Sequence, residues 1–181
     1  LEKTHDSSDI VTRLTLEGHE EDCIVESELV TGVHYIENYS NFMDTEDMSE
    51  ELKQALASFE NACEKRTPLW KAYKNSLSTK RSELTILQNQ EYRYLQELPK
   101  LKEIVDIYTQ KDMNEQANEV ATQYQNMHNL LYGTDTIQGI TDKIAILENE
   151  IRELQNNILV VNNLCKKSTA TTIDMTESVA Y

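Results

Sequence analysis

The chain has 181 residues, a net charge of −15, and only 4 glycines and 2 prolines. So few turn-forming residues argue against a compact fold with many turns, and no apolar run is long enough for a transmembrane helix. The polar residues are mostly Asn, Gln, Glu and Lys, which suit the exposed flanks of long helices. We therefore expect an all-α fold of elongated coiled-coil helices, without membrane insertion.

The negative charge is concentrated at the start of the chain. Residues 1–51 hold 15 acidic and 2 basic side chains, a net −13, which leaves −2 for residues 52–181. This sign argues against direct nucleic-acid binding, because affinity for phosphate comes from Lys and Arg. No basic segment followed by an apolar run lies near Leu1, and the three cysteines are far apart. A cytoplasmic or nuclear location is the expectation.

Residues 1–47 form an acidic N-terminal arm without sustained helical periodicity. One interpretation is a self-repelling, disordered arm. The other is a docking arm that becomes ordered only on a basic protein surface with an apolar groove. Alternating apolar residues near Leu14 also permit a short strand added to a partner's sheet. The expected docking residues are apolar: Ile24, Val25, Leu29, Val30, Tyr35 and Ile36.

A first helix is predicted over residues 48–66. Ser49 is a good N-cap, and Leu52, Leu56, Phe59 and Cys63 recur at helical spacing. The helix should end near Arg66, because Thr67-Pro68 resembles the start of a new helix.

A second, kinked coiled-coil helix is predicted over residues 67–132. Lys80 and Glu91 interrupt its seven-residue repeat, and Pro99 predicts a kink or a break. Beyond Tyr108 the repeat slips by one residue, and Gly133 offers a cap at the helix end. The expected interface residues in this stretch include Trp70, Tyr73, Leu77, Leu84 and Leu87.

The strongest repeat predicts a coiled-coil helix over residues 136–166, continuous from 137 to 165. Its β-branched residues at one seam position favour a parallel dimer, in which Lys143 would face Glu148 of the second chain. Residues 167–181 lack the repeat and predict a flexible tail. The expected interface residues are Ile137, Ile140, Ile144, Leu147, Ile151, Leu154, Ile158 and Val161.

The sequence offers little for catalysis. Its four glycines are scattered without a phosphate-binding motif, and His19 and Cys23 are the one close pair of metal-ligand types. Cys63 and Cys165 fall on apolar seams, where cysteine behaves as a small hydrophobe. We therefore expect a non-enzymatic protein without a catalytic, cofactor or metal site.

Two functions follow from these patterns. The first is a structural coiled-coil subunit of a large intracellular eukaryotic assembly, of the kinetochore, spindle-pole, nuclear-pore or tether type. Its partners would be other coiled-coil chains, in a homo- or hetero-oligomer. The alternative is a regulatory adaptor whose acidic arm docks a basic partner, with the coiled coil serving only to dimerise it.

Overall fold

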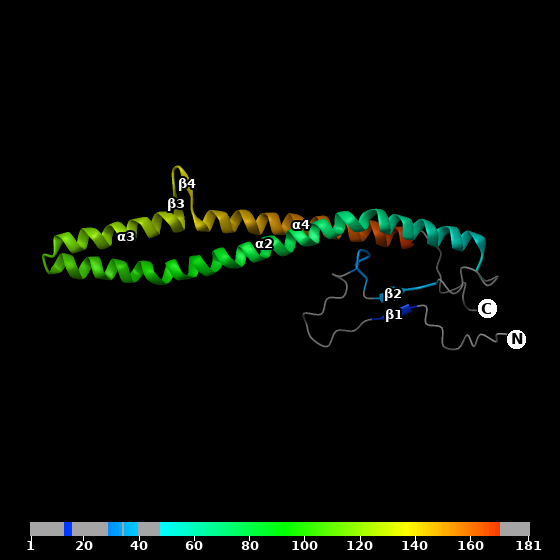
Figure 1. The fold of residues 1–181 in the computed structure, drawn as a ribbon, viewed down its shortest axis with the longest axis horizontal. Coiled ribbons are helices and arrows are strands. Elements are labelled where there is room, and N and C mark those ends of the chain that lie inside the picture. Colours follow the sequence, from blue (N-terminus) through cyan, green and yellow to red (C-terminus); the bar gives the residue numbers. More distant parts are fainter. Residues whose placement is uncertain (1–12, 16–28, 34, 40–47, 171–181) are drawn as a thin grey trace. The chain divides into compact units, whose positions relative to one another are not determined.

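The computed structural model describes residues 13–15, 29–33, 35–39 and 48–170. Of these, 82% are helical, which confirms a mainly α-helical chain. The helices are α2 (Glu50–Gln110), α3 (Asn114–Tyr132) and α4 (Ile140–Ala170). Four short strands, labelled in Figure 1, are β1 (Arg13–Thr15), β2 (Tyr35–Glu37), β3 (Gly133–Thr134) and β4 (Ile137–Gln138).

Two compact units make up the chain. Unit 1 comprises residues 1–73 and 156–181, and unit 2 comprises residues 74–155. Helices α2 and α4 each contribute residues to both units.

Helix α2 runs through both prolines without interruption. The predicted boundary between Arg66 and Thr67 is therefore wrong, and so is the predicted break at Pro99. Pro68 and Pro99 have exposed side chains. Because proline has no N–H, the carbonyl four residues before each proline lacks its usual donor. These carbonyls belong to Glu64 and Leu95, which are both exposed. Water can hydrate these carbonyls, which lowers the cost of the missing bonds. A bend without a break at Pro99 stays a prediction.

The apolar repeat keeps one phase along α2. Steps of four and three residues continue through Pro68, so the first predicted helix and the second share one seam. All of these positions are buried or half-buried, and between 70 and 108 Lys74 is the one further residue that is not exposed. This α2 seam comprises Leu52, Leu56, Phe59, Cys63, Arg66, Trp70, Tyr73, Leu77, Lys80, Leu84, Leu87, Glu91, Tyr94, Leu98, Leu101, Val105 and Tyr108.

The repeat loses its phase where α2 ends. Asp112 adopts a φ of 55°, and the Met113 N–H donates to the Tyr108 carbonyl at 2.9 Å. The Asp112 N–H donates to the Thr109 carbonyl at 3.2 Å, which completes a Schellman cap. Aspartate is one of the few residues other than glycine that tolerates this conformation. The slip after Tyr108 therefore marks a helix end, and the predicted single helix over 67–132 is wrong.

Unit 2 is an antiparallel packing of helices (Figure 1). After the turn, α3 runs back along α2, and α4 continues in the direction of α3. A buried cluster joins Leu98 of α2, Leu131 of α3, and Ile140 and Ile144 of α4. This part of the α4 seam therefore packs against the same chain, rather than against a parallel second copy.

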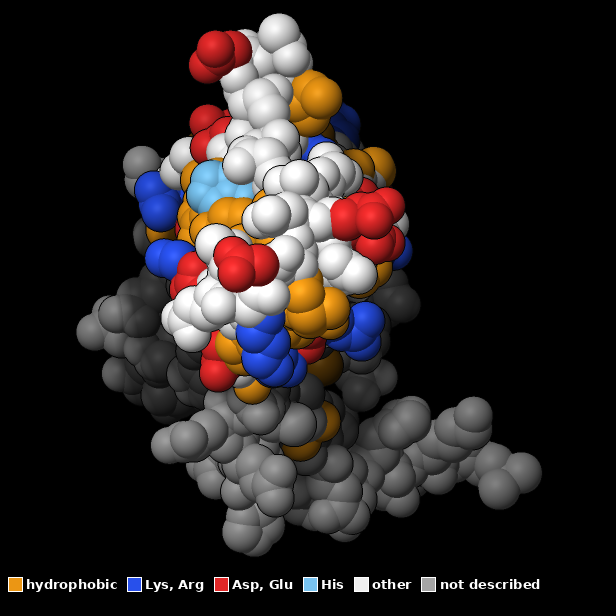
Figure 2. Space-filling model, turned by 90° about the vertical axis from the view of Figure 1, so that its left-hand side faces the viewer, with side chains coloured by type: hydrophobic (Ala, Val, Ile, Leu, Met, Phe, Trp, Pro, Cys, Tyr) orange, Lys and Arg blue, Asp and Glu red, His pale blue; other side chains and the backbone are white. Residues whose placement is uncertain are grey.

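A β-hairpin separates α3 from α4. Strand β3 pairs with β4 in antiparallel register, and the hairpin projects from the surface (Figures 1 and 2). The helix predicted over 136–166 instead spans 140–170, so residues 167–170 of the predicted tail are helical. The rest of the predicted tail, 171–181, lies outside the described residues. Ile137 lies in β4 with 62% of its surface exposed, so its predicted place on the helix seam is wrong.

The hairpin is a six-residue insertion that leaves the seam in phase. Without residues 133–138, Ile140 would follow Leu131 by three positions, which continues the four-three spacing of both helices. Gly139 then follows Tyr132 directly, and a Cβ atom on Gly139 would lie only 2.4 Å from the Tyr132 carbonyl carbon. The Leu131 carbonyl accepts a hydrogen bond from the Thr141 hydroxyl at 3.1 Å. Thr141 is the residue whose N–H would reach that carbonyl in an uninterrupted helix.

This geometry predicts that deleting residues 133–138 fuses α3 to α4 without unfolding unit 2. The seam contacts stay in register, while Gly139 inside the fused helix costs about 1 kcal/mol relative to alanine. The free energy of unfolding should therefore change by no more than about 1 kcal/mol, measured by chemical denaturation with circular dichroism.

A matched control replaces the same six residues with two alanines. The helix is then continuous, but each added residue turns the α4 seam by about 100°, so two move it to the far side. This control should lose cooperative unfolding. If both variants unfold alike, the seam phase does not govern the joining of α3 to α4.

Candidate interaction sites

In unit 1, helix α2 begins where the sequence predicts. The Leu52 N–H donates to the Ser49 hydroxyl at 3.2 Å, so Ser49 caps the helix. Met48, Leu52 and Leu56 form a buried cluster, and Tyr39 packs against it. Tyr39 therefore packs against the first two turns of the helix.

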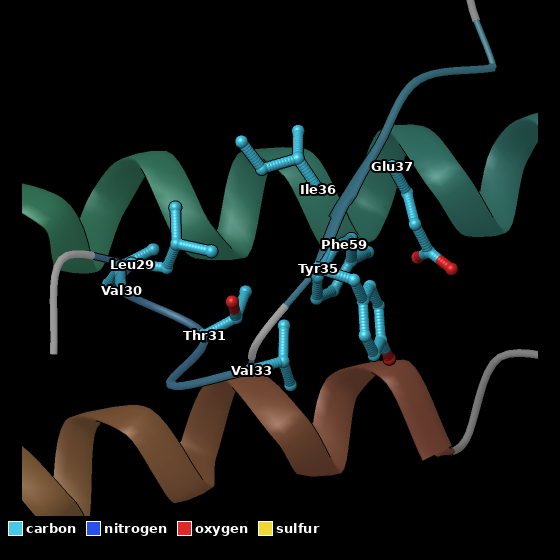
Figure 3. Close-up of a pocket in the computed structure, with 8 residues that line it drawn as sticks. All are labelled: Leu29, Val30, Thr31, Val33, Tyr35, Ile36, Glu37 and Phe59. Atoms are coloured by element: carbon cyan, nitrogen blue, oxygen red, sulfur yellow. The ribbon is translucent and has the colours of Figure 1, made fainter. Parts of the chain in front are cut away.

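The described part of the acidic arm lies on the chain's own helices. Residues 29–33 and 35–37 pass beside α2 and α4 in Figure 3, with Phe59 of α2 behind Tyr35. Strand β1 pairs with β2 of the same chain, placing Leu14 opposite Ile36. The strand expected on a partner's sheet is thus formed within the chain, and these residues find an apolar surface without a second protein.

A small cavity of about 200 Å³ lies between this part of the arm and α2. Its lining is mostly apolar, with Glu37 as the charged member. Pockets for drug-sized ligands span about 300–1,000 Å³, so this cavity is smaller than a typical site for such a ligand. The lining residues are Leu29, Val30, Thr31, Val33, Tyr35, Ile36, Glu37 and Phe59.

A glycine lets the arm approach α4 closely. Gly32 is buried, has a φ of 60° and donates its N–H to the Leu29 carbonyl at 2.9 Å. A Cβ atom at Gly32 would lie 2.8 Å from the Asn162 amide nitrogen and 3.0 Å from its Cβ. Both the turn and the contact with α4 therefore require glycine at this position.

The outer face of the two-stranded sheet is apolar. Leu14 and Ile36 are cross-strand partners and are 54% and 45% exposed. Tyr35 and Glu37, which alternate with Ile36 along β2, are half-buried. One docking residue expected from the sequence, Ile36, is thus available on the surface.

In unit 2, the polar interruption at Lys80 has a partner across the helices. The Lys80 ammonium lies 2.8 Å from the Glu150 carboxylate of α4. The hydrogen bond to Glu150 raises the pKa of Lys80 above its usual value. Both side chains remain partly exposed, so the pair favours one alignment of α2 and α4 more than it adds stability.

Cys63 of α2 and Cys165 of α4 meet in unit 1. Cys165 is fully buried, and Cys63 is half-buried. Burial, together with the neighbouring thiol, raises the pKa of Cys63 to about 12. Cys63 is therefore protonated at neutral pH, as expected of a cysteine within a helix seam.

The expected interface residues differ in burial. Those in α2 and α4 are all buried or half-buried. Buried positions are Trp70, Ile140, Ile144, Leu147 and Val161, and half-buried positions are Tyr73, Leu77, Leu84, Leu87, Ile151, Leu154 and Ile158. Among the arm residues, Leu29, Val30 and Tyr35 are half-buried, while Ile24 and Val25 lie outside the described residues, as do His19 and Cys23.

Sequence reasoning missed several features of these sites. The contact of Gly32 with Asn162 and the ion pair of Lys80 with Glu150 join residues far apart in the chain, and no local pattern predicts them. The hairpin had a detectable signal, since the seam resumes its phase after six residues.

No protein-family model matches the chain, and neither curated proteins nor solved structures provide a match. Among the described residues, no helix combines the length and the apolar character needed to cross a bilayer. The same part of the chain contains no cluster of three or more side chains suited to holding a metal ion.

The Gly32 contact predicts that Gly32→Ala loosens the arm from α4. The positive φ costs an alanine about 1–2 kcal/mol, and the new methyl group meets Asn162. Hydrogen exchange of residues 29–33 should accelerate about tenfold, while exchange in α2 and α4 stays unchanged.

A double variant separates backbone strain from the steric clash. In the Asn162→Ala background the contact with the amide group is removed, while the contact with the Cβ atom and the backbone strain remain, so Gly32→Ala should have a smaller effect there. Equal exchange in the wild type and the Gly32→Ala variant would show that the arm does not rest on α4.

Proposed function

We propose that the chain is a non-enzymatic structural subunit of a larger intracellular assembly. In this proposal its helices form an antiparallel coiled coil with one another and bind partner chains through their outer faces. The supporting observation is that the chain's own packing covers the seams, while large apolar side chains remain exposed on the opposite faces.

The exposed apolar residues cluster at helical spacing. On α4 in unit 1, Leu159, Val160 and Leu164 are exposed, with Val160 and Leu164 one turn apart. We call these three residues the α4 patch. On α2 in unit 2, Tyr92 and Leu95 are also exposed and one turn apart, as are Ile104 and Ile107. Apolar side chains that recur on a helix surface suit packing against a further helix.

The exposed residues of the helices also indicate which class of assembly the chain would join. A chain built of long helices with both signs of charge among its exposed apolar residues (Figure 2) suits packing beside other coiled-coil chains, in a homo- or hetero-oligomer. Kinetochore, spindle-pole, nuclear-pore and tether complexes are assemblies of this type. The three cysteines are far apart in the sequence, which supports a reducing, cytoplasmic or nuclear location.

The proposal predicts that Leu159→Gln with Val160→Gln removes partner chains without unfolding the protein. These side chains are 54% and 56% exposed, so the substitutions should change the free energy of unfolding by no more than about 0.5 kcal/mol. Crosslinking with mass spectrometry should recover fewer partner peptides near α4 than with the wild-type chain.

The matched control is Leu159→Met with Val160→Leu, which keeps the α4 patch apolar. This control should retain the partners that crosslink to the wild-type chain. An unchanged set of crosslinks for the glutamine variant would exclude the α4 patch as a partner surface.

The adaptor function is a second candidate, supported by the exposed pair Leu14 and Ile36. This pair lies within the first 51 residues, which carry a net −13. An apolar pair in acidic surroundings suits a partner with a basic, grooved surface, and opposite charge would accelerate their encounter. In that case the arm is the working element, and the helices serve to dimerise it.

The adaptor function predicts that Leu14→Thr with Ile36→Thr abolishes partner binding, whereas the α4 patch variant does not. Threonine keeps the β-propensity of both positions while removing apolar surface. The control is Leu14→Val with Ile36→Val. Association should also slow as salt rises from about 0.05 to 0.5 M, because the Debye length shortens. Binding unaffected by the threonine variant would leave the structural subunit as the better description.

A further inference from the structure

One side of the α2–α3 pair in unit 2 carries aromatic residues from both helices. Helix α3 runs antiparallel to α2 (Figure 1), so residues that directly follow the seam positions of either helix lie on the same side of the pair. Tyr94 of α2 and Met127 of α3 pack against the same buried cluster. Leu95 and His128, which follow them, therefore lie at a similar level on that side. We call the exposed and half-buried residues at these positions the aromatic face: Tyr92, Leu95, His128 and Tyr132.

The tyrosine rings of the aromatic face are open to a partner. Tyr92 is 65% exposed, and Tyr132 is 47% exposed. The half-buried ring of His128 lies 4.7 Å from the Tyr132 ring, centroid to centroid, and 5.9 Å from the ring of Tyr124. The contact with His128 supports the Tyr132 ring on one side, while nearly half of the tyrosine remains free to pack against another molecule.

The two sides of α2 differ in charge at this level. None of the residues that directly follow seam positions 84, 87, 91, 94 and 98 is charged. On the opposite side, the residues that directly precede these positions include Glu83, Arg93 and Glu97. Interfaces between proteins are depleted of charge at their centres and enriched in aromatic residues. The aromatic face therefore has the composition of a binding surface, and the opposite side does not.

Carboxylates lie beside the aromatic face. Glu91 directly precedes Tyr92, is half-buried in the α2 seam, and takes part in none of the ion pairs between described residues. Asp135, three residues after Tyr132, is exposed on the hairpin. Residues 112–142 contain five carboxylates and no lysine or arginine. Open aromatic rings next to an unpaired carboxylate favour a cation supplied by another chain.

We propose that the aromatic face binds a basic amphipathic helix of a partner chain through its arginine side chains. A guanidinium group stacks on the ring of Tyr92 or Tyr132 and donates to the Glu91 carboxylate, while apolar residues of the same helix pack on Leu95. Arginine suits this face better than lysine, because its planar group can stack on a ring and still donate hydrogen bonds within its plane. The inference rests on the proposed function, since it assigns a chemistry to one partner chain, but it uses a different surface from the α4 patch.

The test titrates the full chain with a short amphipathic helical peptide of arginine, leucine and alanine. Nuclear magnetic resonance follows the ring protons of Tyr92, His128 and Tyr132, which should shift as the peptide binds. A second peptide carries citrulline in place of arginine, which keeps the planar side chain but removes its charge. It should bind at least about fivefold more weakly. Equal binding of the two peptides would show that the face takes a neutral helix, and would overturn the proposal.

Two charge variants separate the aromatic face from the general negative charge of the chain. Glu91→Gln should weaken binding of the arginine peptide about fivefold, because the guanidinium group loses its carboxylate. The matched control, Glu97→Gln, removes the same charge from the opposite side of α2 and should leave binding unchanged. Equal weakening by both variants would show that only net charge matters, and would overturn the proposal.

Two ring variants test the stacking independently of Glu91. Tyr92→Leu with Tyr132→Leu keeps apolar surface but removes both rings, and should also weaken binding about fivefold. Tyr92→Phe with Tyr132→Phe keeps the rings and should bind as the wild type does. Unshifted ring resonances, or full binding by the leucine variant, would overturn the proposal. The proposed function fails on a different result, namely unchanged crosslinks for the α4 patch variant, so the two failures are distinguishable.

Discussion

The apolar seam is the constraint on which the rest of the structure depends. Trp70 lies two residues after Pro68, and Leu98 lies immediately before Pro99, and both are buried. A helix end at either proline would redirect these side chains and expose them, at about 1.5–3 kcal/mol for each large apolar group together with the loss of neighbouring contacts. A proline within a helix costs about 3 kcal/mol. A continuous helix α2 is favoured over a break because the seam residues on both sides of each proline then stay buried.

The same constraint explains where the helices do end. After Tyr108 the apolar residues no longer continue the α2 seam, so nothing opposes the turn at Asp112. At residues 133–138 the chain leaves the helix, yet Ile140 returns to the position that the seam requires. The hairpin can therefore project from the surface without disturbing the packing beneath it. Its exposed residues are free to vary with function, because the seam places no demand on them.

Positions where the seam is not purely apolar add specificity or chemistry. Lys80 keeps its charge near the surface and meets Glu150, which favours one alignment of the helices in unit 2. In unit 1, two seam positions are occupied by the cysteines Cys63 and Cys165. Helix α4 supports the described arm residues and also carries the α4 patch. It therefore takes part in both proposed functions.

The sequence by itself determined the helical class, the start of α2 at Ser49 and the end of α3 before Gly133. These features depend on local periodicity and on caps that involve residues a few positions apart. Tertiary structure decided that the seams pair within the chain, that the prolines are tolerated and that the arm rests on α2 and α4. An apolar stripe specifies that a helix face is buried but not which helix covers it. The contacts of Leu98 with Ile140 and of Gly32 with Asn162 form only when distant segments meet, so no local pattern could reveal them.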